Sequence, residues 1–339
     1  MKRWGLVLFG IAALAAALAA GVNWWLARPL PLARDTVELS IEPGATPRQI
    51  ARAWVDAGVQ APTWMLYEWF RWSGQARRIR AGSYEIDRNV SPRQLLQKMV
   101  LGDETLAVTR IIEGWNFRQL RAELARAERL VPTTANLTDA EVMTLIGAPG
   151  VAPEGQFFPD TYAYSKGSSD ADLLRRAHHA MQHRLAAAWA ERAPDTPLRS
   201  ADEALTLASI VEKETGVATD RAKVAGVFTN RLRLGMPLQT DPTVIYGLGA
   251  AFDGNLRKRD LLADSPYNTY TRAGLPPTPI ALPGREALAA AVRPDERHEL
   301  YFVATGLPDG SHEFSRTLAD HERAVARYLQ RYRQRDGKQ

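Results

Sequence analysis

The chain opens on a continuous apolar stretch before any periodic pattern begins. From Gly5 to Leu26 the only polar side chain is Asn23, and the stretch closes on two tryptophans. About 20 apolar residues span a bilayer, and tryptophan favours the level of the lipid headgroups. Two basic residues precede the stretch, so the positive-inside rule predicts a cytoplasmic N-terminus. We therefore predict one transmembrane helix at residues 5–26, with all that follows residue 27 outside.

A cleaved signal peptide is the alternative, because the alanine-rich run contains several A-x-A sites. The stretch of 22 residues exceeds the usual signal-peptide core of about 7 to 15 residues, which favours an anchor. Residues 28–34 contain Pro29 and Pro31, which cannot continue a helix. We interpret them as a short extended linker.

Beyond residue 35, strand-like alternation gives way to an amphipathic helical period three times. The alternating stretches cover residues 36–41, 82–86 and 106–112. The three following helices share an Arg-Gln pair and polar N-cap candidates, which are Thr46, Ser91 and Asn116. Short capped helices can resemble one another by chance, but the shared pair favours a common unit. Such modules are similar to LysM-like carbohydrate-binding units, and a structural spacer fits the repeats equally well.

Longer helical periods cover residues 170–192, 200–215 and 220–234. In the first, capped from Ser168 or Ser169, His179 and His183 stand four residues apart, as metal ligands on a helix do. No further ligand follows at a suitable spacing. We therefore expect a solvated helix face and no metal.

The helix at 200–215 carries the candidate chemistry. Ser200 and Glu203 predict a capping box at its start. Glu214 follows Ile210 by four residues, so it projects from the apolar arc of the helix. A carboxyl at an apolar face is a candidate general acid, because desolvation raises its pKa. Periodicity alone is more typical of an exposed helix end with solvated charges than of a catalytic residue, and Glu212 is the runner-up for catalysis.

Polar and aromatic side chains gather downstream among prolines and glycines. Loops of this kind on a rigid scaffold suit a sugar polymer, whose ring faces stack on aromatics and whose hydroxyls bind amides and carboxylates. Turn-rich loops without a function are the alternative. The candidate substrate-binding residues are Gln239, Thr240, Asp241, Tyr246, Tyr267, Asn268 and Tyr270.

Composition narrows the class of protein without identifying it. The 339 residues allow two modest domains. A formal charge of +5 is too mild and too scattered to indicate nucleic acid. The absence of cysteine excludes disulfides, thiol nucleophiles and cysteine-ligated zinc.

Three runs make a family resemblance specific. They are ASIVEKETGVATDRAKVAGVFTNRLRLGMPLQTDPTVIYGLG, SPYNTYTRAGLPPTPIALPG and EGQFFPDTY. The chain resembles the MltG (YceG-like) family of endolytic murein transglycosylases. The resemblance implies a single-span inner-membrane protein with a periplasmic catalytic domain. It further implies cleavage between N-acetylmuramic acid and N-acetylglucosamine within nascent glycan strands, leaving 1,6-anhydromuramic ends, with the second glutamate of E-K-E-T, Glu214, as the catalyst.

The predicted fold class is α+β: a transmembrane helix, a LysM-like β/α subdomain and a mixed α+β catalytic domain. We place the anchor at residues 1–27, the linker at 28–34, the LysM-like region at 35–125 and the catalytic domain at 126–335. Peptidoglycan strands and the inner membrane, through residues 5–26, are the expected partners. Cell-wall synthases are plausible further partners, although no docking motif is visible, and we expect no cofactor.

In the mechanism that we expect, Glu214 acts first as general acid and then as general base. Gln239, Asn268 and Tyr270 would orient the sugar or stabilise developing charge, and Asp241 would hold the sugar or tune Glu214. Two alternatives stay open. One is a hydrolytic muramidase in which Asp241 activates water, and the other is a non-catalytic peptidoglycan-binding scaffold.

Overall fold

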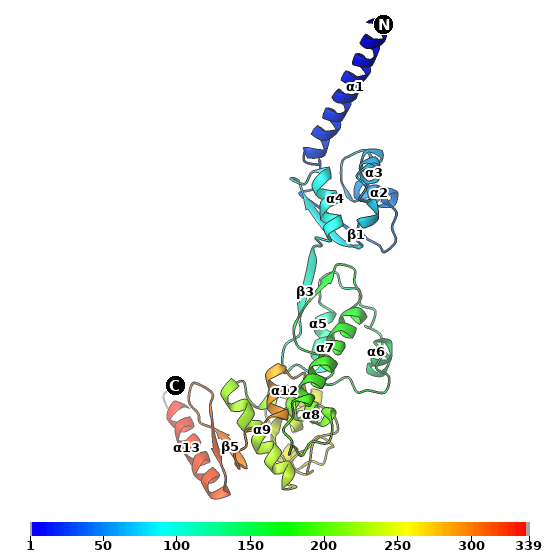
Figure 1. Cartoon of the computed structure of the whole chain (residues 1–339). Coiled ribbons are helices and arrows are strands. Elements are labelled where there is room, and N and C mark those ends of the chain that lie inside the picture. The colour runs from blue at the N-terminus through cyan, green and yellow to red at the C-terminus, as the bar shows by residue number, and fades with distance from the viewer. Residues whose placement is uncertain (1, 337–339) are drawn as a thin grey trace. The chain divides into compact units, whose positions relative to one another are not determined.

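The computed structural model describes residues 2–336, which form two compact units. The first unit runs up to Val108 and also contains Glu128–Val131 and Ala163–Ser168. The second contains Thr109–Ala127, Pro132–Tyr162 and the chain from Ser169 onward. Both helices and strands are present, as the α+β prediction requires (Figure 1).

The first helix, α1, runs from Lys2 to Ala27 and is apolar along its length. Its segment Phe9–Ala27 is long and hydrophobic enough to cross a membrane, and almost none of it is buried by the rest of the protein. A signal sequence has the same properties. The helix is thus consistent with the predicted span, while its orientation stays a prediction.

The first unit continues with a short sheet and three helices. Strands β1 (Thr36–Ile41) and β2 (Gly82–Asp87) pair antiparallel. Helices α2 (Pro47–Ala57), α3 (Thr63–Trp72) and α4 (Pro92–Leu101) and the 3-10 turn η1 (Ala76–Arg78) complete it. Its core surrounds Trp54, Phe70 and Tyr84, all fully buried. This unit carries two of the three predicted strand–helix repeats, and its kinship with LysM stays a prediction.

The third repeat consists of β3 (Leu106–Arg110) and α5 (Phe117–Leu124), and α5 belongs to the second unit. Strand β3 pairs with β4 (Thr161–Ser165) and not with β1 or β2. All three predicted N-caps are confirmed. Thr46, Ser91 and Asn116 each accept a bond from the third residue of their helix and complete a capping box.

The second unit is built around α8 (Ala201–Glu214), which contacts four other helices. These are α7 (Asp170–Ala190), α9 (Ala218–Arg233), α10 (Asp241–Leu248) and α12 (Arg285–Val292). Figure 1 shows α8 and α9 next to α12. The remaining elements are α6 (Asp139–Leu145), η2 (Gly249–Ala251), α11 (Lys258–Leu262), the hairpin β5 (Tyr301–Ala304) and β6 (His312–Ser315), and α13 (Leu318–Asp336).

Burial explains the central position of α8. Every residue from Ala204 to Val211 is buried, so the helix is enclosed along its middle and exposed only near its ends. Its start differs from the prediction in one detail. The Ser200 hydroxyl accepts from Glu203 N at 3.2 Å, but the Glu203 carboxylate accepts from Arg199 N at 2.7 Å and not from Ser200. The predicted capping box is thus only half formed, because the extended backbone before the helix presents Arg199 N to the carboxylate.

Candidate active site

Glu214 is the last residue of α8, and its half-buried side chain leaves the packed face of that helix. Ile210 and Val211, one turn earlier, are fully buried, while Lys213 is exposed. The helix stops at Thr215, whose backbone is extended (φ −144°, ψ 129°). The carboxyl therefore lies at the border of the core, where helical periodicity placed it.

Burial raises the pKa of the Glu214 carboxyl to about 7. The Thr240 hydroxyl donates a hydrogen bond to Oε1 of Glu214 and lowers this pKa, whereas the nearby charge of Asp241 raises it. Within residues 2–336, no basic side chain forms an ion pair with Glu214. A carboxyl of this kind is about half protonated near neutral pH, so it can both donate and accept a proton.

A cluster of buried threonines holds the Thr240 hydroxyl in place. The Thr240 amide donates to Thr269 Oγ1 at 3.1 Å, and the Thr243 hydroxyl donates to the Thr240 carbonyl at 2.8 Å. The hydroxyls of Thr243 and Thr269 are themselves 2.9 Å apart. The segment before α10 and the loop around Thr269 are thus joined directly beside Glu214.

Asp241 and Tyr270 form a second contact next to Glu214. The Tyr270 hydroxyl donates to Asp241 Oδ1 at 2.6 Å. Burial raises the pKa of Tyr270, and the charges of Asp241 and Glu214 raise it further. The structure therefore brings Thr240, Asp241 and Tyr270, three of the predicted site residues, close to the predicted catalyst.

Gln239 lies in a strained backbone conformation, with a φ of 51°. Left-handed non-glycine residues are costly and concentrate at functional sites. The buried guanidinium of Arg231 supports this segment, since it donates to the Leu238 carbonyl at 2.8 Å and to Gln239 Oε1 at 3.3 Å. It also donates to the Leu300 carbonyl at 2.8 Å. Arg231 is not among the residues predicted from the sequence, because no local pattern indicates that its guanidinium joins this segment to the distant Leu300 carbonyl.

Asn268 is 1% exposed, and its side-chain amide forms hydrogen bonds within its own loop. Its nitrogen donates to the carbonyls of Leu261 at 3.0 Å and Ala263 at 2.7 Å. Its oxygen accepts from Tyr270 N at 2.9 Å. We had expected Asn268 to orient a sugar, whereas its contacts orient Tyr270.

Tyr246 and Tyr267 line a cavity of about 710 Å³. Their rings meet edge to face with centroids 4.9 Å apart. The same cavity is lined by Lys213 and Pro242, the chain neighbours of Glu214 and Asp241. It therefore lies along α10, and Glu214 itself is not among the residues that line it.

Glu154 is a second perturbed carboxyl and is not among the residues predicted from the sequence. It is 6% exposed and lines the cavity with Tyr246 and Tyr267. It accepts from Phe117 N at 3.1 Å and from the Tyr246 hydroxyl at 3.1 Å. Burial raises its pKa to about 7 against these hydrogen bonds. Glu154 stands in the turn-rich PEGQFFPDTY stretch, but no local pattern indicates that Phe117 and Tyr246 would surround it.

Glu212, the runner-up, is committed to other partners. Its Oε2 accepts from Gly284 N at 2.9 Å, and its Oε1 lies 3.8 Å from Arg221 Nη2. Burial raises its pKa as well. Because Glu212 is tied to a backbone amide and a cation, Glu214 is the freer of the two to exchange a proton.

The profile of the YceG-like family matches residues 39–327. This chain belongs to the YceG-like family. That match includes both units and every site residue described above.

Relatives and a solved structure agree with the YceG-like assignment. The Bacillus subtilis protein named endolytic murein transglycosylase is 30% identical over 313 residues, covering 87% of this chain and 86% of its own. The Streptococcus pneumoniae protein of the same name is 28% identical, and the match covers 74% of this chain but 51% of that longer protein. The crystal structure of a yceG-like protein from Listeria monocytogenes aligns with a TM-score of 0.54 at 27% identity, covering 85% of this chain and 98% of that one.

Proposed function

We propose that this protein is an endolytic lytic transglycosylase that cuts the bond between N-acetylmuramic acid and N-acetylglucosamine inside peptidoglycan strands. The observation that carries the proposal is the Glu214 carboxyl, with its pKa near 7 and only a hydroxyl donor beside it. The names of the bacterial relatives agree with the proposed substrate and reaction.

In the first step, Glu214 is protonated and donates its proton to the glycosidic oxygen. The bond from muramic C1 to that oxygen breaks, and positive charge develops at C1, as in other glycosidases. The free end of the N-acetylglucosamine unit leaves as a neutral alcohol. Asp241 and Tyr270 flank the site, so the carboxylate of Asp241 can stabilise the developing positive charge.

In the second step, the Glu214 carboxylate takes the proton of the muramic 6-hydroxyl. The oxygen of that hydroxyl bonds to C1 at the same time. The product is a 1,6-anhydro ring, and Glu214 ends protonated, ready for another turnover. The Thr240 hydroxyl contact stabilises the carboxylate between the two steps. Neither step consumes water or a second carboxylate.

A hydrolytic muramidase is the second candidate, and it rests on Asp241. This carboxylate is exposed and close enough to Glu214 to raise its pKa. Hydrolysis would need it to activate a water, but the Tyr270 hydroxyl already donates to its Oδ1 at 2.6 Å. A hydrogen bond donated to a carboxylate stabilises its charged form and makes it a weaker base, which favours transglycosylation.

The experiment is digestion of long, uncrosslinked glycan strands by the full-length protein, followed by mass spectrometry and chain-length analysis. We expect anhydromuramic ends on fragments of intermediate length from the earliest time points. Release of single disaccharides from one end would contradict endolytic cutting. A non-catalytic scaffold would bind the strands and release nothing.

We further propose that α1 anchors the enzyme in the inner membrane with its N-terminus in the cytoplasm. The support is the apolar helix and the two basic residues at its start. The catalytic unit would then act in the periplasm on strands still close to the membrane, where synthases work. Retention of the full-length protein in the membrane fraction after carbonate washing tests the anchor, and release into the soluble fraction contradicts it.

A further inference from the structure

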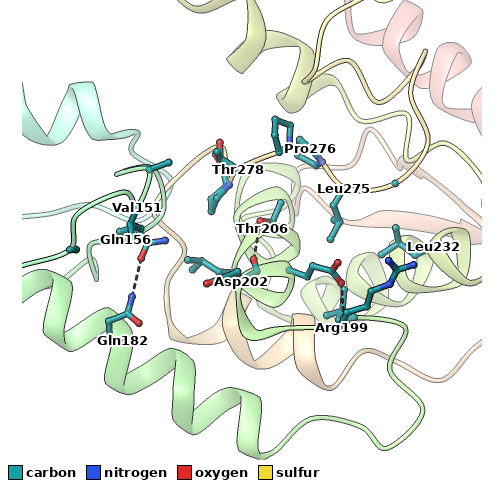
Figure 2. A pocket seen from close by; sticks show the side chains of 18 of the residues that line it. Val151, Gln156, Gln182, Arg199, Asp202, Thr206, Leu232, Leu275, Pro276 and Thr278 are labelled. Atoms are coloured by element: carbon teal, nitrogen blue, oxygen red, sulfur yellow. Dashed lines mark hydrogen bonds between the residues drawn. The ribbon is translucent and has the colours of Figure 1, made fainter. Parts of the chain in front are cut away.

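A second cavity lies at the start of α8, away from the end that carries Glu214. It measures about 880 Å³, which is ample for a short peptide or a small ligand. Figure 2 shows its walls: Gln156 and Gln182 on one side, Arg199, Asp202 and Thr206 below, and the segment through Pro276 and Thr278 above. None of the predicted site residues lines it.

A buried amide is directed into this cavity. Gln156 is 6% exposed, and its oxygen accepts from Gln182 Nε2 at 2.9 Å. Its nitrogen turns away from Gln182 toward the cavity (Figure 2) and has no hydrogen-bond acceptor in the described part of the chain. An amide nitrogen that faces a cavity without a protein acceptor is free to donate to a ligand carbonyl.

One basic and one acidic side chain, neither of them in an ion pair with another described residue, line the same cavity. The Arg199 guanidinium and the Asp202 carboxylate are exposed, and neither forms an ion pair or side-chain hydrogen bond within residues 2–336. Leu198, Leu232 and Leu275 supply an apolar part of the lining. A zwitterionic ligand with small apolar side chains and backbone carbonyls complements this combination.

This cavity adjoins the cavity that lies along α10. Ala152 and Thr278 line both. The Thr278 hydroxyl lies 2.9 Å from the hydroxyl of Tyr267, so a residue of the α10 cavity holds the boundary between the two cavities. A substituent on a sugar bound in the α10 cavity can therefore extend past Thr278 into the second cavity.

We propose that this cavity binds the peptide stem of the muramic acid unit that is being cut. The stem is the substrate's own zwitterionic peptide, with methyl side chains, free carboxylates and, at its diamino acid, an ammonium group. Arg199 would bind a stem carboxylate, Asp202 the ammonium, and Gln156 a backbone carbonyl. This inference rests on the proposed function, because it assigns a second subsite to the same reaction.

The test compares strands that carry stems with strands stripped of them by an amidase, using the full-length enzyme. We expect kcat/KM to be at least about tenfold higher on stem-bearing strands, as for one charge-assisted contact. Asp202→Asn and Arg199→Gln should each remove most of that preference while leaving the rate on stripped strands unchanged. The matched control is Glu296→Gln, at an exposed carboxylate outside the cavity.

Equal rates on the two kinds of strand would overturn the stem site while leaving the proposed function intact. The same holds if both substitutions leave the preference unchanged. If neither strand is cut, the proposed function fails, and binding of a soluble muramoyl tetrapeptide to the wild-type protein decides the stem site separately. There we expect Asp202→Asn to weaken binding by about tenfold, and an unchanged affinity would refute the assignment.

Discussion

The Thr240 hydroxyl donates its hydrogen bond to Oε1 of Glu214, joining the end of α8 to the segment that begins α10. This bond and burial act on the Glu214 carboxyl in opposite directions, and burial is the larger effect. The carboxyl is therefore protonated over a range in which an exposed glutamate is fully ionised.

Glu214→Gln keeps the size of the side chain but leaves it unable to act as a general acid or base. We expect strand cleavage to fall by about 10² to 10⁴-fold, the usual range for general acid–base catalysis. Melting temperature and glycan binding should change little, which circular dichroism and a pull-down on sacculi can check. Glu212→Gln is the control on the same helix, and its larger effect should be on stability, because Gly284 N and Arg221 lose a charged partner. If Glu212→Gln abolishes cleavage and Glu214→Gln does not, the roles are reversed.

The pH profile should report the protonation of Glu214. Because the acid form starts the reaction, kcat/KM should fall about tenfold per pH unit above pH 7. Thr240→Val removes a bond that lowers the pKa, so this alkaline limb should move to higher pH. Asp241→Asn removes a charge that raises the pKa, so the limb should move to lower pH.

Asp264→Asn is the control for the pH profiles, because that exposed carboxylate pairs with Arg272 and has no effect on Glu214. Its alkaline limb should coincide with that of the wild type. Coincident limbs for all four proteins would show that another group limits the rate.

Glu154 should make stability depend on pH. Its folded pKa, about 7, lies above the ordinary value of 4.5. A carboxyl whose pKa is raised in the folded state contributes its full stabilisation, up to about 3 kcal/mol here, below its unfolded pKa. This contribution is lost as the pH rises through the folded pKa of about 7. Thermal unfolding of Glu154→Gln should therefore lose less stability between pH 5 and 8 than the wild type. The same loss in both proteins would exclude Glu154 as the source.

Gly155 has a backbone that only glycine adopts easily, with a φ of 80°. A Cβ there would stand 2.5 Å from Pro279 Cβ. We expect Gly155→Ala to cost about 1 to 3 kcal/mol in unfolding free energy. Gly216→Ala is the control, because nothing lies within 4 Å of a Cβ at that position and its φ is ordinary. Equal melting temperatures for the two variants would contradict this account of the turn.

Local patterns predicted the local structure well. Strand β1 matches the predicted residues, and α8 begins and ends within one residue of its prediction. Capping at Thr46, Ser91 and Asn116 was equally readable, since it depends on residues three apart. The helical period placed Glu214 at the edge of a buried face, although the same period also allowed an exposed helix end.

Contacts between residues distant along the chain could not be predicted from local sequence patterns. Nothing near β3 indicates that it pairs with β4 instead of joining the first sheet. Glu154 acquires its raised pKa only because Phe117 and Tyr246 come from distant segments to enclose it. Arg231 supports Gln239 together with Leu300, 69 residues further along the chain. Asn268 likewise has the residue type of a ligand-binding group and the contacts of a loop-forming one.

The most direct test of the central claim is strand cleavage in water enriched in ¹⁸O. If Glu214 directs the muramic 6-hydroxyl to C1, the new ends are anhydro sugars, one water lighter than reducing ends, and contain no ¹⁸O. Glu214→Gln should yield no such ends. Reducing muramic ends that carry one ¹⁸O atom would mean that water attacked C1, and would contradict the transglycosylase mechanism.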